Sequence, residues 1–527
     1  MAETIIDAVR ATAAKWPQRI ALVCGDEQVT YAQLMARADA AAQALLSGRQ
    51  GAASSAPASD DGEVAGLLCG NRPEFAYGLL GALAAKRIVA VLPTMAPPPL
   101  LAMMAEEAGV RRVLTTEDMA PRLAEAKVET HTIEGIVASS HGAISMAAFH
   151  PPPRKLASDE QKTDSKSQIQ GLTADSRFKI QNARAAVLLY TSGSTGRPKA
   201  VALSDANILA NIDGSVRAAG FSDQDVMLAI LPLFHAYGLT VTLLLPLVLG
   251  ARSVMVERFV PRSVLGMIER HRVTGLVAVP TQYRLLAKEP APVDASSLRL
   301  CIAGAERLSE SAAIEFEARF GKPILQGYGA TEAAPVISIN PPAANRMGAV
   351  GEPLPNLRVT VRDGDRVLDP GKLGEVCVEG PNVMLGYYNH PEATAEKIVG
   401  GVLRTGDQGW LDTDGYLHLA GRADDLIKVA GEKIYPAEVE QAIEQIDGVD
   451  EVAVLGVPDA TRGSALVAFV QAKPGAVLTE AALRAACRGC VDGMKMPRSF
   501  VLLEQLPRTP TGKLDKRLLA EKAAARQ

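Results

Sequence analysis

The alternation of apolar and polar positions predicts strands and helices that follow one another along most of the chain. From Glu63 to Pro93 a short apolar strand is followed by a turn, an apolar helix and a second apolar strand, which is the pattern of a βαβ unit. A similar alternation returns from Ser253 to Val279, and another apolar strand precedes Glu306. Because strands that are apolar on both faces are typical of parallel sheets between helices, we predict an α/β fold.

The pattern changes after about Gly415. Short alternating strands and an amphipathic helix, PAEVEQAIEQ, lead there to a charged tail, so we expect a small α+β domain after a large domain of parallel and mixed sheets layered with helices. Two stretches, from Gly48 to Gly62 and from Pro151 to Arg177, are expected to be surface loops. A docking segment and a disordered insertion both stay open for the second.

One stretch, from Val226 to Ala251, carries no formal charge and resembles a membrane span in composition. Its interior holds Pro232, Gly238 and Pro246, which break a lipid-facing helix. We therefore expect a buried strand, loop and helix and no transmembrane span. Peripheral contact with a membrane stays open.

Composition narrows the class of protein. Hydrophobic residues make up 48% and charged residues 22% of the 527 residues, which is the balance of a globular protein, and a net charge of -4 argues against nucleic-acid binding. Six scattered cysteines and a start without a signal sequence favour the cytoplasm. Cys487 and Cys490 form a lone CxxC, which we interpret as two thiols on a helix, with zinc or redox use as the alternative.

The run YTSGSTGRPK, which follows an apolar strand, has the composition of a loop that holds a polyphosphate. Glycines let the backbone approach an anion, hydroxyls donate hydrogen bonds and a lysine supplies charge; these residues are Thr191, Ser192, Gly193, Ser194, Thr195, Gly196 and Lys199. The loop does not match the Walker pattern, because Arg197 and Pro198 separate the second glycine from the lysine. A flexible linker is the alternative, and the loop alone predicts only phosphate binding.

This loop resembles the signature of the adenylate-forming superfamily, which contains acyl- and aryl-CoA synthetases, luciferases and peptide-synthetase adenylation domains. Further motifs occur in the family's order, so that the resemblance covers nearly the whole chain: PLFHAYG at 232–238, GYGATE at 327–332, TGD at 405–407, GRADDLIKVAGEKIYPAEVE at 421–440 and PTGK at 510–513. The resemblance implies that a carboxylate attacks the α-phosphate of ATP and expels pyrophosphate. Positive charge and Mg²⁺ are needed for such a transition state.

The resemblance also implies a role for each motif. Glu332 would bind Mg²⁺, because a hard cation prefers carboxylate oxygen, and Thr331 would donate to the α-phosphate. Asp407 would accept hydrogen bonds from the ribose hydroxyls, and Arg422 would make a further nucleotide contact. Tyr328, which has Gly327 and Gly329 as its neighbours in the sequence, would stack on the adenine. The opposite wall of the adenine pocket would consist of Gly304, Ala305 and Glu306.

In this resemblance Lys513 is the catalytic lysine of adenylation, and it requires the small domain to close over the large one. Asp424 corresponds to the family's hinge, which places the domains at residues 1–423 and 424–527. In a second orientation Lys428 and the following residues, with Gly431 at the tip, would line the entry tunnel of the thiol, because a residue without Cβ lets pantetheine pass close to the backbone.

The acid is expected to be apolar. Relatives that activate amino acids hold the ammonium group with an aspartate, whereas this chain has Phe234 and His235 there, and a buried ammonium without a carboxylate would be costly. His235 would contact the acid or gate its pocket, with a packed core histidine as the alternative. An apolar run and several small residues then favour a fatty acid; the small residues are Ala303, Ala330, Ala333 and Ala334.

The residue sequences of these motifs are especially similar to those of fatty acyl-CoA ligases and of bacterial acyl-acyl-carrier-protein synthetases. The acceptor is therefore expected to be coenzyme A or the phosphopantetheine of a carrier protein. Asp205 departs from the pattern, since many relatives have a histidine there. The alternatives are an acyl-AMP ligase that feeds a synthase without using coenzyme A, an aryl-CoA ligase, and an inactive acyl-binding scaffold.

Overall fold

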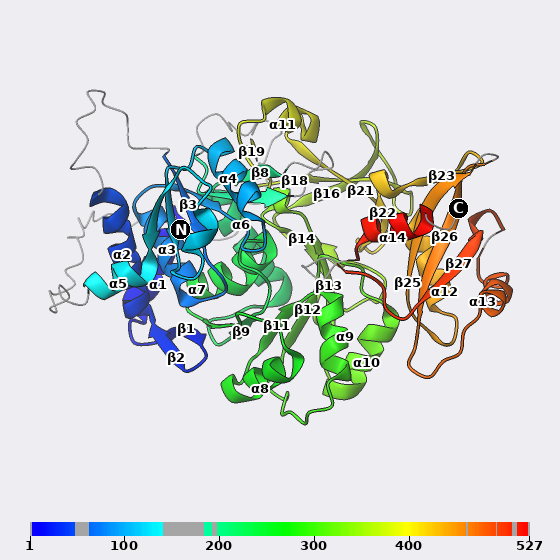
Figure 1. Cartoon of the computed structure of the whole chain (residues 1–527), viewed down its shortest axis with the longest axis horizontal. Coiled ribbons are helices and arrows are strands. Elements are labelled where there is room, and N and C mark those ends of the chain that lie inside the picture. The colour runs from blue at the N-terminus through cyan, green and yellow to red at the C-terminus, as the bar shows by residue number, and fades with distance from the viewer. Residues whose placement is uncertain are drawn as a thin grey trace, which may run out of the picture.

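The computed structural model describes residues 3–47, 63–140, 184–191, 198–459, 462–491, 493–508 and 514–524. It is a mixed α/β structure with a large N-terminal domain and a smaller C-terminal domain, which lies at one side of the molecule in orange and red (Figure 1). The predicted fold class is confirmed.

The first sheet of the large domain has nine strands, and its central strands are parallel. Their order across the sheet is β15 (Glu352–Pro353), β14 (Val336–Ile339), β13 (Leu325–Gly329), β12 (Leu300–Ala303), β11 (Gly275–Ala278), β9 (Val226–Ala229), β10 (Arg252–Met255), β1 (Ile20–Cys24) and β2 (Glu27–Thr30). The alternation from Ser253 to Val279 corresponds to β10, α8 (Pro261–His271) and β11, but β9 lies between the two strands and pairs with both.

The second sheet contains the predicted βαβ unit. Its strands are β19 (Gly386–Tyr387), β8 (Lys199–Leu203), β7 (Val187–Thr191), β4 (Ile88–Val91), β3 (Val64–Leu68), β5 (Arg112–Thr115) and β6 (Glu129–Thr132). Strands β3 and β4 are parallel neighbours joined by α3 (Pro73–Ala84), as the apolar pattern predicts.

A third, antiparallel sheet completes the large domain, and a separate sheet forms the small one. The third sheet contains β16 (Arg358–Asp363), β17 (Arg366–Val367), β18 (Gly374–Glu379), β20 (Ile398–Val399), β21 (Val402–Leu411) and β22 (Leu417–Arg422). The small domain has the hairpin of β23 (Ile427–Val429) and β24 (Glu432–Ile434), and a sheet of β25 (Val449–Asp459), β26 (Gly463–Ala472) and β27 (Ser499–Leu503).

Helices cover both faces of these sheets. Those between the first two sheets are α1 (Ile5–Lys15), α2 (Tyr31–Ser47), α3, α6 (Asp205–Ala219), a π-helix (Gly238–Leu244) and α7 (Leu245–Leu249). The outer faces of the two sheets carry α8, α9 (Pro280–Lys288), α10 (Glu310–Phe320) and α4 (Pro98–Glu107). In the small domain α12 (Pro436–Glu444) and α13 (Glu480–Cys487) cover one face and α14 (Lys516–Ala524) the other. Two further helices are α5 (Ile133–Ser140) and α11 (Pro391–Lys397).

The uncharged stretch from Val226 to Ala251 is the predicted strand, loop and helix: β9, a connection, the π-helix and α7. The π-helix is buried at every position. Among the residues that the structure describes, no helix is both long and apolar enough to cross a membrane.

The N-terminus of α6 is fixed by polar side chains. Ser204 and Asn207 cap it reciprocally, which satisfies amides that the helix leaves unpaired. Asp205, the departure from the family pattern, accepts a hydrogen bond from the amide of Ile5 at 2.8 Å and so ties α1 to this end of α6. Burial raises the pKa of the Asp205 carboxyl above its usual range. The aspartate therefore holds two helices together.

Close packing of α2 against α3 depends on Gly81. A Cβ at this position would lie 2.6 Å from the carbonyl oxygen of Ala38 and 2.6 Å from the Cβ of Ala41. We expect Gly81→Ala to lower the free energy of unfolding by about 1–3 kcal/mol, because the two helices must move apart. Chemical denaturation followed by circular dichroism measures the change.

Gly266→Ala on α8 is the matched control for Gly81→Ala. Gly266 is also helical, but a Cβ there meets nothing within 4 Å. This substitution is expected to raise the free energy of unfolding by up to about 1 kcal/mol through helix propensity alone. Equal effects of the two substitutions would show that the α2–α3 contact tolerates a side chain.

Candidate active site

The phosphate-loop motif joins two antiparallel strands of the second sheet. Thr191 ends β7 and pairs with Lys199, which begins β8. The end of β7 and the start of β8 therefore lie side by side in the sheet. Of the predicted loop residues, those outside the described part of the chain are Ser192, Gly193, Ser194, Thr195 and Gly196.

Glu332 is held by a tyrosine that sequence reasoning missed. The Tyr387 hydroxyl donates to Glu332 Oε1 at 2.7 Å, and Lys199 Nζ lies 5.4 Å from the centroid of the Tyr387 ring. Tyr387 reaches this place because β19 pairs with β8. Tyr387 thus connects the predicted magnesium ligand to the lysine of the phosphate loop. Thr331 directly precedes Glu332 in a short 3₁₀ turn.

Tyr328, Asp407 and Arg422 form a second cluster. The Tyr328 hydroxyl donates to Asp407 Oδ2 at 2.5 Å, and Arg422 Nη1 donates to Asp407 Oδ1 at 3.2 Å. Burial raises the pKa of the Asp407 carboxyl, although the tyrosine and the arginine act in the opposite direction. Burial, followed by the Asp407 charge, raises the pKa of Tyr328 well above its usual range. The structure therefore brings together three predicted residues around one desolvated carboxylate.

The two predicted walls of the adenine pocket leave adjacent strands. Ala303 on β12 pairs with Gln326 on β13, so Gly304 and Gly327 follow at the same edge. Ala305 has a φ of +70°, and Glu306 Oε2 accepts from the Thr281 hydroxyl at 3.2 Å. A Cβ at Gly329 would overlap the carbonyl of Pro335, so only glycine fits there.

Buried asparagines fix the loops that carry these residues. Asn211 on α6 donates to the carbonyls of Ala333 and Val336 at 3.1 and 2.8 Å, next to the Thr331–Glu332 turn. Asn71 donates to the carbonyls of Ala229 and Leu231 at 3.1 and 2.8 Å. Its carbonyl oxygen accepts from the amide of Leu233, at the start of the PLFHAYG segment. Neither asparagine belongs to a motif that the sequence singled out.

The PLFHAYG segment places an exposed histidine beside a buried hydroxyl. His235 is exposed, with its ring centroid 4.5 Å from that of Phe234, so the interpretation as a packed core histidine is wrong. The Tyr237 ring packs 3.0 Å from where a Cβ of Gly304 would lie. Its hydroxyl is buried, and it finds no hydrogen-bond partner among the described residues.

The residues expected at the hinge and at the thiol entrance are exposed. Asp424 lies in a short 3₁₀ turn after β22, Lys428 lies on β23, and Gly431 has a φ of +91° at the tip of the β23–β24 hairpin. Lys516 pairs with Asp425 at 2.6 Å, next to the expected hinge. Lys513 lies outside the described residues.

Magnesium fits this site better than a metal held by protein alone. Among the described residues, no group of three or more His, Cys, Asp or Glu side chains gathers to hold a metal. Mg²⁺ usually keeps several waters and binds one or two carboxylates together with substrate phosphates, which matches Glu332 near the phosphate loop.

The two thiols of the CxxC differ in position. Cys487 is buried at the end of α13 and Cys490 is exposed beyond it.

Comparison with known proteins supports an ATP site. The profile of the family described as AMP-binding enzyme matches residues 9–388, and that of the AMP-binding enzyme C-terminal domain matches residues 438–513. The chain is 32% identical over 520 residues to a sulfoacetate–CoA ligase of Cupriavidus necator, covering 98% of this chain and 97% of that one. It is 36% identical over 345 residues to a long-chain-fatty-acid–CoA ligase of Bacillus subtilis, covering 64% of this chain and 61% of that one.

The fold also matches a solved structure over nearly its whole length. ATP-bound MatB from Rhodopseudomonas palustris superimposes with a TM-score of 0.84 and 28% sequence identity, covering 99% of both chains. The match therefore includes both domains.

We expect Tyr387→Phe to weaken the binding of ATP with magnesium by about tenfold, because a carboxylate loses a charge-assisted hydrogen bond. Isothermal titration calorimetry with and without Mg²⁺ measures the change. Tyr388→Phe is the matched control, since the Tyr388 ring packs against a different apolar cluster. Equal affinities of the two variants would show that Tyr387 does not orient Glu332.

Proposed function

The chain belongs to the AMP-binding enzyme family, and on that premise we propose that it is an ATP-dependent ligase that joins a carboxylic acid to coenzyme A. In the first half-reaction a carboxylate oxygen of the acid attacks the α-phosphorus of ATP, the bond to the pyrophosphate oxygen breaks, and an acyl-adenylate forms. In the second, the thiolate sulfur attacks the acyl carbonyl carbon and AMP leaves. The thiol proton passes to solvent.

The Tyr328–Asp407–Arg422 cluster is the observation that carries this proposal. A carboxylate has two oxygens, and both ribose hydroxyls of a nucleotide can donate to it. Asp407 is largely buried, with 14% of its side chain exposed, whereas the Arg422 side chain is 52% exposed. Because the Asp407 carboxylate has lost most of its contact with water, a ligand with its own hydrogen-bond donors is favoured there. A nucleotide has such donors, and the Tyr328 ring at the same place is suited to stack on its base.

A second group of residues would supply the charges needed for phosphoryl chemistry. Lys199 and Thr331 would bind phosphate oxygens, and Glu332, oriented by Tyr387, would hold Mg²⁺. When bound, Mg²⁺ supplies positive charge to the departing pyrophosphate. Electrostatic stabilisation by groups already in place is the largest expected contribution to the rate.

The small domain supplies the remaining charge. We place its boundary between residues 423 and 424, with Asp424 at the hinge and Lys513 as the lysine of adenylation. After rotation, Lys428 and Gly431 would line the path of the thiol. The open space around Gly431 and its positive φ support this role, because pantetheine needs close access to the backbone.

The acid that we propose is apolar, with a fatty acid as the first candidate. The buried π-helix after PLFHAYG and the similarity to a long-chain-fatty-acid–CoA ligase support it. A short acid with an acceptor group is the second candidate. The buried Tyr237 hydroxyl, which has no hydrogen-bond partner among the described residues, would donate to such a group, and a relative matched over 97% of its length is a sulfoacetate–CoA ligase. A carrier protein in place of coenzyme A is a further alternative.

A panel of acids tests the reaction and the acid class together. Purified protein with ATP and Mg²⁺ is given palmitate, hexanoate, benzoate or sulfoacetate, with or without coenzyme A. We expect pyrophosphate with a fatty acid, and AMP and thioester only when coenzyme A is present. Pyrophosphate without thioester would favour an acyl-AMP ligase, and a preference for sulfoacetate or benzoate would overturn the fatty-acid proposal. If none of the acids supports pyrophosphate exchange, the enzymatic function itself is overturned.

Lys513→Ala separates the two half-reactions. We expect adenylation to fall by about 100-fold or more, because a charge that stabilises the transition state is removed. Thioester formation from a supplied acyl-adenylate should be preserved. Lys522→Ala, on the exposed side of α14, is the control and should leave both half-reactions intact. An equal loss of both steps in Lys513→Ala would show that the role is wrong.

A further inference from the structure

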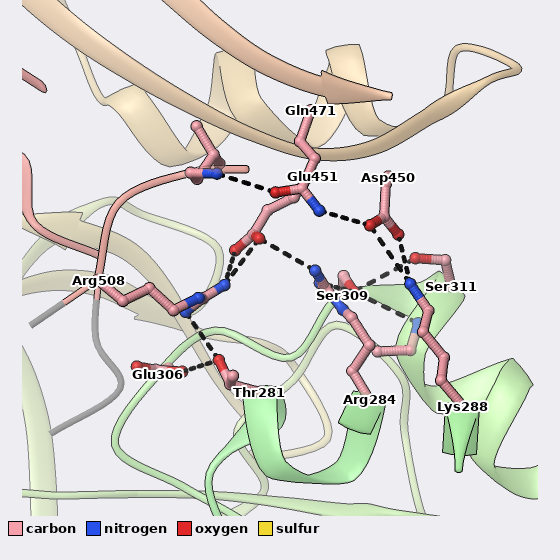
Figure 2. Close-up of polar contacts among 12 residues, drawn as sticks. Thr281, Arg284, Lys288, Glu306, Ser309, Ser311, Asp450, Glu451, Gln471 and Arg508 are labelled. Atoms are coloured by element: carbon pink, nitrogen blue, oxygen red, sulfur yellow. Dashed lines mark hydrogen bonds and ion pairs between the residues drawn. The ribbon is translucent and has the colours of Figure 1, made fainter. Parts of the chain in front are cut away.

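A network of charged side chains joins α9 of the large domain to the sheet of the small domain (Figure 2). At its centre the Glu451 carboxylate accepts hydrogen bonds from Arg508 Nη2 at 2.7 Å to each of its oxygens, and from Arg284 Nη1 at 3.1 Å. Arg508 and Glu451 belong to the small domain, whereas Arg284 lies on α9. One carboxylate is therefore shared between the two domains.

A neighbouring carboxylate repeats this arrangement. Asp450 accepts from Lys288 Nζ at 3.3 and 3.4 Å across the interface, and from Gln471 Nε2 at 2.9 Å within the small domain. The side chains of Asp450, Glu451 and Arg284 are 6%, 13% and 14% exposed. The Arg284–Glu451 pair is therefore shielded on both sides and interacts more strongly than a pair on an open surface, whereas Lys288 is 40% exposed and its pair with Asp450 is weaker.

The network reaches the proposed nucleotide pocket. Arg508 Nη1 donates to the Thr281 hydroxyl at 2.9 Å, and Thr281 donates in turn to Glu306 in the expected adenine wall. The backbone of Arg508 also pairs with that of Leu514, which directly follows Lys513 in the chain. Arg508, which precedes the segment that carries the proposed catalytic lysine, is thus tied to the large domain beside the proposed nucleotide pocket.

The β23–β24 hairpin, in contrast, lies beside the third sheet of the large domain. Lys433 and Tyr435 line a cavity of about 660 Å³ together with Arg362 and Glu375 of the third sheet. This is the arrangement expected when the Lys513 side of the small domain, and not the Lys428–Gly431 side, serves the nucleotide.

We propose that Arg284 and Lys288 are positioning residues that hold the small domain in its adenylating orientation by pairing with Glu451 and Asp450. The inference rests on the proposed function. Each carboxylate has one partner in its own domain, Arg508 or Gln471, and one on α9. When the domain rotates, only the α9 partners are lost, and neither carboxylate is left alone. The Glu451 contact can therefore open without the large penalty of an isolated buried charge, because Glu451 keeps the charge of Arg508, and Asp450 keeps the hydrogen bond from the Gln471 amide.

Substitution on the large-domain side tests the proposal without disturbing the small domain. In Arg284→Met and Lys288→Met the apolar stem stays and the charge is removed. We expect each to slow acid-dependent pyrophosphate exchange by about tenfold, and the double variant to slow it further. Thioester formation from a supplied acyl-adenylate should stay within about twofold of wild type or rise. Arg217→Met is the control, because Arg217 pairs with Asp213 one turn earlier on α6 and both side chains are exposed.

A second measurement is independent of activity. Two fluorescent labels carried by unnatural amino acids at Glu317 on α10 and Glu521 on α14, both exposed, report the distance between the domains. We expect a broader or shifted distance distribution in the double variant than in wild type and in Arg217→Met. Thermal unfolding midpoints confirm that each variant is folded.

The outcomes separate the two proposals. A wild-type protein without exchange overturns the proposed function, while the label distances still test the interface. Unchanged distances in the double variant overturn the positioning role of Arg284 and Lys288. The positioning role is also overturned if the double variant loses both half-reactions equally. It is overturned as well if the wild type is active and pyrophosphate exchange in the double variant stays within about twofold of it. Glu451→Gln, which keeps the shape and removes the shared charge, should reproduce the split between the half-reactions.

Discussion

Buried asparagine amides hold the loops on which the candidate site depends. Loops that leave the ends of strands carry carbonyl groups that no neighbouring strand satisfies, and inside a protein each of them needs a donor. Asn211, which is fully buried, supplies two donors and one acceptor around the Thr331–Glu332 turn. Asn207 donates to the carbonyls of Pro381 and Val383 at 2.7 and 2.8 Å, just before the Met384 amide bonds the Glu332 carbonyl. Loops distant in sequence are thus fixed by one face of α6.

The use of amides in these positions has a physical reason. An asparagine offers donors and an acceptor without a charge, so it can be buried without the desolvation penalty of an ion. The site can then reserve its charges for the ligand. Asp407 shows what a charge costs there, since burial raises the pKa of its carboxyl even with Tyr328 and Arg422 as partners. Neutral groups therefore build the frame, and charged groups are left to meet the nucleotide.

The sequence predicted the parts of this structure that are local. Periodicity identified the β3–α3–β4 unit, and the charge-free stretch was correctly assigned to the interior because its prolines and glycine exclude a lipid-facing helix. Tyr328, Asp407 and Arg422 were found through motifs, and the structure brings them into contact. The order of β9, β10 and β11 could not be predicted, because periodicity says which strands are buried and not which are neighbours.

The residues that were missed act through contacts between distant segments. Tyr387 meets Glu332 only because a two-residue strand pairs with β8, and Glu451 meets Arg284 only because two domains touch. Neither contact has a period or a spacing along the chain. The two cases also differ in permanence. Tyr387 lies within one domain and can be fixed, whereas Glu451 must exchange partners if the small domain turns. A carboxylate with one partner in each domain suits that exchange, because it is never stripped of both.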